Sequence, residues 1–350
     1  MSNIATISEL LTLSQCQYEL YDVGRKIDKL SHEQFLQIEN NMLPYPFPNQ
    51  GHACLAIAFW QEKSPQPYLW FVKLPLDERG LLNQGARNHF IAIIIEALGA
   101  DLSVDPTAQQ EELLKSNPYH FTPAQYKLAT LNSLLKLSLK QAPSSYYPAC
   151  QAYFHGLTPI AQWQEVGVQG ICDYAARLNE SFNGITNEAA LISILEKLPE
   201  PVLNALCSAL EHQKINAKLT EKLISLFWWH FNAKAHHLAL LLLRALASNS
   251  ETTEVQNLIT KLLKQEVINE EYLITLAGRH WQGLANIPVM MEYLEALVNG
   301  QANDLFPAIF KDLVAIPLLR PILLLSIREP KRSEALAKAI GLLFVQNTVH

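Results

Sequence analysis

Charged side chains are scarce in this chain of 350 residues. Asp, Glu, Lys and Arg together make up 17% of it, against about a quarter of an average soluble protein. The formal charge is −6 at pH 7, and none of the segments 1–100, 101–184 and 185–350 has a net positive charge. The long-range attraction that dominates nucleic-acid affinity is therefore missing, which argues against a nucleic-acid partner. Because so few charges accompany 49% hydrophobic residues, we expect an apolar surface patch that meets a protein partner.

Paired cysteines and membrane signals are missing as well. The five cysteines lie far apart and no CxxC occurs, a pattern typical of reduced, buried thiols in a cytoplasmic protein. The opening residues, MSNIATISELL, have neither the basic stretch nor the long apolar stretch of a signal peptide. No apolar run reaches the roughly 20 residues that a membrane span needs. We therefore predict a cytoplasmic protein without a membrane span.

Motifs that would identify a reaction are also absent. The glycines follow neither the GxGxxG nor the GxxxxGK[ST] spacing of a phosphate-binding loop, and HExxH does not occur. The segment 227–231, FWWHF, with His236 and His237, is rich in aromatic and histidine side chains but has no carboxylate nearby in sequence. Core and loop histidines explain it better than a zinc site, which needs three or four converging ligands. We predict no catalytic residue, no metal site and no cofactor.

The signals that are present begin with a small α+β domain over residues 1–104. We expect helices over 7–15 and 81–98, a third helix that begins after Ser31, and a strand over 18–23. The Pro-rich segment 44–48, PYPFP, forbids helix. The apolar run 53–60 and the alternating segment 68–74 predict a β-hairpin, with Trp70 and Val72 on one face and Lys73 on the other.

The rest of the chain predicts helices only. Residues 105–184 read as a helical connecting region, with a helix capped by Thr122 and a break at 183–184. In residues 185–350, second helices are expected to begin near Pro201, Ala235, Asn269 and Asn303, 34 residues apart. First helices fall between them, near Asn187, Ala217, Thr252 and Ile287. A two-helix unit of this length is typical of an α-solenoid, here a loose HEAT-like array. A non-repetitive helical bundle is the alternative.

Four stretches carry a resemblance that extends over the whole chain: PYPFPNQGH (44–52), FW (59–60), WFVKLPLDERGLLNQGARNHF (70–90) and EALG (96–99). They resemble an uncharacterised bacterial protein family found mainly in gammaproteobacteria. The resemblance implies a bacterial cytosolic protein. It implies no reaction, substrate or cofactor, and no functional residue is carried over from it.

Two groups of side chains are candidates for binding. The first follows the hairpin, where an Arg/Lys pair beside a carboxylate could hold an anionic ligand or a partner's carboxylate; its members are His52, Lys73, Asp77, Arg79 and Arg87. A solvated turn with local ion pairs is the simpler interpretation. The second consists of Trp70 and Trp229. Because two adjacent tryptophans cannot face the same side of a helix, Trp228 or Trp229 must point away from the core. Packing of that ring between helices or against the neighbouring domain is the simpler interpretation; the alternative is an exposed Trp, which often anchors a protein interface.

These observations favour a non-enzymatic, cytosolic interaction or adaptor protein that binds another protein through its helical-repeat surface. The alternative is an enzyme or small-ligand-binding protein with a site between the N-terminal domain and the helices. In that case the charged residues near the hairpin would line the site, and Lys73 and Arg87 would have to point the same way.

Overall fold

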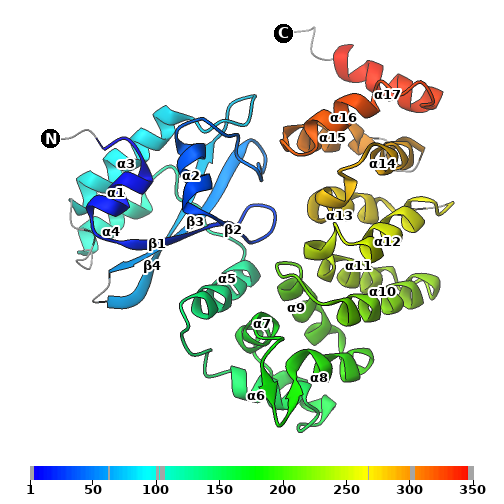
Figure 1. Cartoon of the computed structure of the whole chain (residues 1–350), viewed down its shortest axis with the longest axis horizontal. Helices are drawn as coiled ribbons and strands as arrows, with labels where there is room; N and C mark the ends of the chain where they lie inside the picture. The colour runs from blue at the N-terminus through cyan, green and yellow to red at the C-terminus, as the bar shows by residue number, and fades with distance from the viewer. Residues whose placement is uncertain are drawn as a thin grey trace. The chain divides into compact units, whose positions relative to one another are not determined.

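The computed structural model describes residues 4–61, 64–99, 102, 107–266, 268–299 and 304–345. It is mostly helical, with a small sheet near the N-terminus (Figure 1). The chain divides into two compact units. Unit 1 comprises Met1–Pro123 with Lys311–Arg320, and unit 2 comprises Ala124–Phe310 with Pro321–His350. No helix among the described residues is both long and apolar enough to cross a membrane.

Unit 1 contains a four-stranded antiparallel sheet in the order β2-β1-β3-β4. Its strands are β1 (Gln17–Asp22), β2 (Asp28–Leu30), β3 (His52–Gln61) and β4 (Ser64–Pro75). The predicted hairpin is present as β3 and β4, and the predicted strand over 18–23 is β1. The short strand β2 had no signal of its own, because three residues are too few to show an alternating pattern.

The helices of unit 1 begin at side-chain caps that can be read from the sequence. They are α1 (Ile7–Leu13), α2 (His32–Glu39), α3 (Gln84–Leu98) and α4 (Ala108–Lys115). Thr6 accepts a hydrogen bond from the Glu9 backbone N–H, and Ser31 accepts one from Gln34. Helix α3 begins three residues later than predicted, because Asn83 caps it and Leu82 forms a bridge with Leu76.

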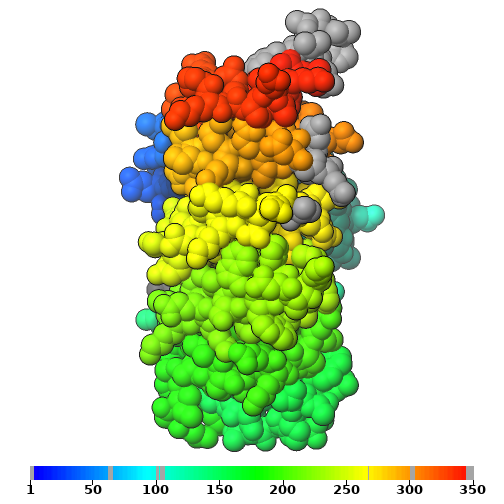
Figure 2. Space-filling view, turned by 90° about the vertical axis from the view of Figure 1, so that its right-hand side faces the viewer, coloured from blue at the N-terminus to red at the C-terminus, as the bar shows by residue number. Residues whose placement is uncertain are grey.

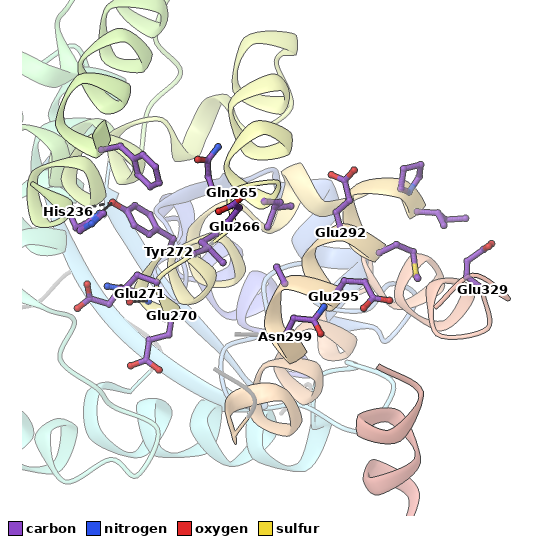
Figure 3. Close-up of a pocket in the computed structure, with 18 of the residues that line it drawn as sticks. His236, Gln265, Glu266, Glu270, Glu271, Tyr272, Glu292, Glu295, Asn299 and Glu329 are labelled. Atoms are coloured by element: carbon purple, nitrogen blue, oxygen red, sulfur yellow. Dashed lines mark hydrogen bonds between the residues drawn. The ribbon is translucent and has the colours of Figure 1, made fainter. Parts of the chain in front are cut away.

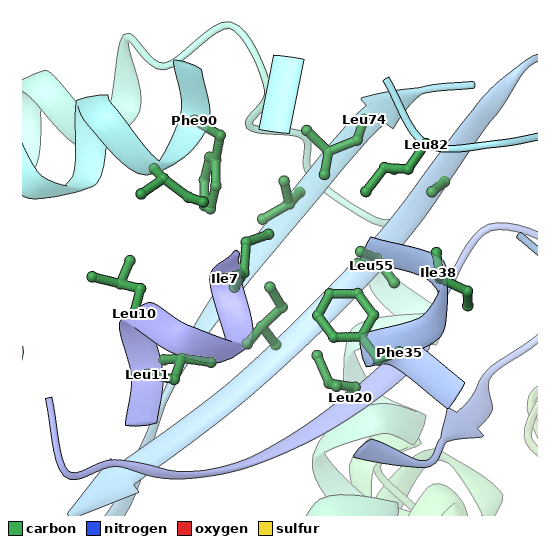
Figure 4. Close-up of a cluster of buried hydrophobic side chains, with 14 of the residues drawn as sticks. Ile7, Leu10, Leu11, Leu20, Phe35, Ile38, Leu55, Leu74, Leu82 and Phe90 are labelled. Atoms are coloured by element: carbon green, nitrogen blue, oxygen red, sulfur yellow. The ribbon is translucent and has the colours of Figure 1, made fainter. Parts of the chain in front are cut away.

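The core of unit 1 lies on one face of the sheet, under α1, α2 and α3 (Figure 4). Phe35 of α2, Leu10 of α1 and Phe90 of α3 are all 3% exposed or less. Strand β3 contributes Leu55 and its alternate neighbours to this cluster, while Cys54 and the intervening alanines are also buried. The continuous apolar run of β3 therefore reflects burial on both of its faces.

Unit 2 is built from helices and one very short hairpin. Its α-helices are α5 (Gln125–Ser138), α6 (Tyr147–Phe154), α7 (Val168–Ala176), α8 (Asn187–Ile194), α9 (Glu200–Leu210), α10 (Ala217–Asn232), α11 (His236–Ala245), α12 (Thr253–Leu263), α13 (Glu270–Arg279), α14 (Ile287–Asn299), α15 (Phe306–Ala315, which continues into residues of unit 1), α16 (Arg320–Ser326) and α17 (Glu334–Val345). Among the described residues, 3₁₀ helices cover Ile160–Glu165, Leu195–Lys197, Ala247–Asn249 and Trp281–Leu284.

Two local predictions in this region were wrong. Strands β5 (Ser181–Phe182) and β6 (Ile185–Thr186) form a hairpin where only a break was expected. Asn183 and Gly184 have φ of 51° and 79°, the left-handed pair that a tight hairpin turn requires. Helix α5 begins after Ala124, without the expected Thr122 cap. Phe121 N–H donates to the Phe71 carbonyl, so the chain before α5 is held extended along β4.

The helices of unit 2 follow one another in chain order. Helices α9, α11 and α13 pack in succession, and so do α10, α12 and α14. Figure 2 shows the same order as bands that run from green to red. The observed helix starts agree with the predicted ones within one residue at Pro201, Ala235 and Asn269, whereas Asn303 lies outside the described residues.

Helix positions alone do not establish a repeat. Ala209, Leu243 and Ala277, which follow one another at spacings of 34, are all buried. Leu206 is fully buried, however, while Ile274, two such spacings further along the chain, is 47% exposed. The solenoid interpretation therefore stays a prediction.

Candidate functional site

The charged candidates near the hairpin are mostly engaged with their own neighbours. Arg79 pairs with Asp77 at 3.1 Å in an exposed turn, and the backbone N–H groups of Arg79 and Leu81 donate to the same carboxylate. The Leu81 N–H contributes most to lowering the pKa of Asp77. A ring nitrogen of His52 lies 2.8 Å from the Gln50 carbonyl oxygen. This arrangement corresponds to the simpler interpretation, a solvated turn with a local ion pair.

Arg87 lies away from that turn, inside unit 1. It is 4% exposed, and its guanidinium donates to the Glu39 carbonyl and to the Asn88 side chain. Lys73 alternates along β4 with Val72 and Leu74, which face the core covered by α3. Lys73 and Arg87 therefore lie on opposite sides of the sheet. The five candidates do not form one cluster.

The two aromatic candidates have different environments. The Trp70 ring is half-buried and lies 4.3 Å from the Phe59 ring and 5.9 Å from the Phe90 ring. Trp229 on α10 is 65% exposed, whereas Phe227 on the same helix is fully buried. The expectation that one of the paired tryptophans points away from the core is confirmed for Trp229.

A large hollow lies in unit 2, between α13, α14 and the loops beside them (Figure 3). Its volume is about 1550 Å³. Helix α14 forms one wall with residues at helical spacing: Pro288, Met291, Glu292, Glu295 and Asn299. The opposite face of α14 is apolar and buried, with Met290, Tyr293 and Leu294 in the core. We call this hollow the acidic groove.

One wall of the acidic groove is aromatic. The rings of Phe231 and Tyr272 lie 5.6 Å apart, and a ring nitrogen of His236 lies 3.0 Å from the Tyr272 hydroxyl. Burial raises the pKa of Tyr272, and the nearby Glu271 raises it further. The phenol therefore stays neutral at physiological pH.

Carboxylates dominate the rest of the groove. Among the described residues that line it, there is one lysine, Lys331, against six glutamates: Glu266, Glu270, Glu271, Glu292, Glu295 and Glu329. Glu292 pairs with Lys264 at 3.4 Å, and Glu295 accepts hydrogen bonds from the backbone and hydroxyl of Ser333. The other four have no side-chain ion pair with any described residue. The groove therefore carries surplus negative charge.

The positions of Glu270 and Glu271 in the fold reduce the repulsion between their negative charges. Glu270 and Glu271 occupy the first turn of α13, where the helix dipole favours negative charge. Asn269 caps the same helix by accepting a hydrogen bond from the Glu271 N–H. Glu270 and Glu271 are exposed, so water screens their mutual repulsion.

None of the glutamates was singled out from the sequence. Only Phe231 and His236 belonged to a segment that attracted attention. The polar stripe on α14 and the Glu270-Glu271 pair were visible signals, but they are typical of any solvated helix. Glu329 is 59 positions beyond Glu270, and only tertiary packing brings both to one hollow.

The arrangement suits non-covalent binding. It combines acceptor groups, aromatic rings and apolar side chains such as Met291 and Ile287. Within the described ranges, no group of three or more His, Cys, Asp or Glu side chains is placed to hold a metal ion.

A family model described as "Protein of unknown function (DUF3549)" matches residues 2–344. No curated protein and no solved structure matches the chain.

Proposed function

The chain belongs to the DUF3549 family of proteins of unknown function, and we propose that it is a non-enzymatic protein-interaction module. Its acidic groove would bind a cationic, partly apolar segment of a partner protein. The observation that carries this proposal is the surplus of carboxylates beside an aromatic wall in one hollow of unit 2.

The chemistry of the groove selects the partner's side chains. A guanidinium group can bind a carboxylate through two parallel hydrogen bonds and can also stack on an aromatic face. Glu271 and Tyr272 are adjacent at the start of α13 and both line the groove. Arginines interspersed with apolar residues would therefore fit it better than lysines or acidic residues.

The order of the helices supports the proposal that unit 2 is a helical-repeat array. An α-solenoid presents an extended surface on which a peptide can lie. Exposed Trp229 would be a second anchor for the same partner, since large aromatic side chains dominate interface energies.

We place this activity in the cytoplasm. The five cysteines are all buried and form no disulfide with one another, as expected for a reducing compartment. For the alternative, a small-ligand site lined by the charged residues near the hairpin, the opposite positions of Lys73 and Arg87 remove its main support.

The test uses the full chain and a labelled dodecapeptide in which Arg and Leu alternate. Fluorescence anisotropy is measured at about 50 and 200 mM NaCl, since exposed charge pairs weaken with salt. We expect saturable binding that weakens at high salt, and no binding of the peptide with Glu in place of Arg.

A double variant locates the site. Glu270→Gln with Glu271→Gln removes two charges from the groove and should weaken binding about tenfold, at up to about 1 kcal/mol for each exposed pair. The matched control is Glu254→Gln, an exposed first-turn glutamate of α12 that does not line the groove. Equal affinities for the double variant and the wild type, or equal binding of the acidic peptide, would contradict the proposal.

A further inference from the structure

A separate apolar pocket lies within unit 1, beside β4 and between α3 and α4. Its volume is about 250 Å³. Its walls include Trp70 and Phe71 of β4, Phe90 and Leu98 of α3, and Leu114 of α4. These residues come from three different elements, and the packing of α4 against α3 brings them around the pocket.

The side chains that form the walls of the pocket are held in place by contacts with one another and with neighbouring protein side chains. The Trp70 ring packs between Phe59 and Phe90, and the Phe71 ring lies 6.3 Å from Phe121 in an edge-to-face arrangement. Aromatic pairs of this geometry are favourable beyond the area that they bury. The cavity is therefore preformed.

The edge of the sheet at this pocket is already occupied. Lys73 N–H donates to the Tyr119 carbonyl at 2.7 Å, and Phe121 N–H donates to the Phe71 carbonyl at 3.3 Å. An incoming peptide strand would find the hydrogen-bonding groups of this stretch of β4 taken, so strand addition does not fit here.

The volume of the pocket and the charges at its rim indicate which class of ligand it can bind. An apolar cavity of about 150 Å³ holds one benzene, and drug-sized ligands need about 300 Å³ or more. The charged side chains at the rim, Glu111 and Lys115, pair with each other at 3.4 Å. The pair has no net charge, so it does not favour an ionic ligand. We propose that this pocket binds a neutral aromatic molecule of one or two fused rings, an activity independent of the acidic groove.

The experiment is a calorimetric titration of the full chain with 2-naphthol. We expect saturable binding with one site per chain. Leu114→Trp fills the pocket from α4 and should weaken binding by at least about tenfold, because the ligand then has no volume to enter. The matched control is Leu113→Trp, the exposed neighbour on the same helix that does not line the pocket; it should bind as the wild type does.

A second filling variant covers the case in which Leu114→Trp fails to fold. Leu98→Phe narrows the same pocket from α3, and circular dichroism checks that each variant is folded. The proposal is overturned if the wild type does not bind 2-naphthol, or if folded filling variants bind as tightly as Leu113→Trp. Loss of binding in the filling variants alone supports it.

Discussion

The Glu211 carboxylate, at the end of α9, accepts a hydrogen bond from Arg244 Nε of α11 at 3.0 Å while being fully buried. The Nε of Arg279, on α13, lies 3.4 Å from the same oxygen. One buried carboxylate thus joins the ends of α9, α11 and α13, every second helix along this part of unit 2. Both arginines are about a quarter exposed, with side-chain exposures of 26% and 25%, so the charges of the arginines remain partly solvated while that of Glu211 does not.

Replacing Glu211 should destabilise unit 2 strongly. In Glu211→Gln the two guanidinium groups lose their counter-charge, and breaking a buried pair in this way costs about 3–5 kcal/mol. Urea unfolding followed by circular dichroism measures the free energy of unfolding. The control is Glu196→Gln, whose partner Lys222 is half-buried and whose own side chain is 60% exposed; loss of this solvent-screened pair should change the free energy of unfolding far less. Similar costs for the two variants would show that the buried network contributes little.

The stability of unit 1 should depend on pH because of Glu39. Its carboxylate accepts hydrogen bonds from the Ile7 and Ser8 N–H groups at the start of α1 and from the Ser8 hydroxyl. Burial nevertheless raises the pKa of Glu39, although these hydrogen bonds and Arg87 oppose the shift. The folded chain therefore binds this proton more tightly than the unfolded chain does.

The sign of the effect follows from that difference. The contribution of protonated Glu39 to stability is fully present below about pH 4.5, its ordinary value, and is lost as the pH rises through the folded-state pKa. The free energy of unfolding of the wild type, relative to Glu39→Gln, should therefore fall between pH 4.5 and pH 7.5. Urea melts of both chains at the two pH values measure it. A relative stability that rises with pH would mean that the charged form is the one the fold favours.

Phe227 and Trp229 should respond oppositely although they are two positions apart on α10. Phe227→Ala removes a fully buried ring that packs against Phe231 and Tyr272, at a cost of about 3–5 kcal/mol. Trp229→Ala removes an exposed ring and should change stability by no more than about 0.5 kcal/mol. Thermal melting of the two variants compares them directly. A large loss for Trp229→Ala would mean that its ring is covered in the native protein.

Glu295 should control the order of α17. It accepts hydrogen bonds from the Ser333 N–H and hydroxyl, and Ser333 in turn accepts one from the Leu336 N–H. Glu295→Ala should lower the local stability of α17 by about 1–2 kcal/mol, as expected for a hydrogen-bonded charge. Hydrogen exchange of residues 334–343 measures the change. Glu292→Ala, one turn earlier on α14, leaves the cap intact and should not alter that exchange.

Parts of the candidate site could have been read from the sequence, and parts could not. The FWWHF segment marked α10 as unusual, and Trp229 is exposed as one of the pair had to be. Lys73 and Arg87, however, were grouped by their nearness in sequence, and an alternating strand followed by a helix on one face separates them. The acidic groove combines residues of α10, α13, α14 and the loop after α16, which no local pattern connects.

Local sequence patterns are sufficient to place most of the helices and strands. Caps such as Thr6 and Ser31, the alternation in β4 and the apolar stripes of α9 to α14 are local signals, because backbone hydrogen bonding and side-chain periodicity act over a few residues. Tertiary structure decided which side chains meet. Glu211 finds Arg244 and Arg279, and Glu270 shares a hollow with Glu329, because helices pack through their buried faces and so place distant polar residues together. Those contacts depend on the packing of the whole core, so no short segment of the sequence can reveal them.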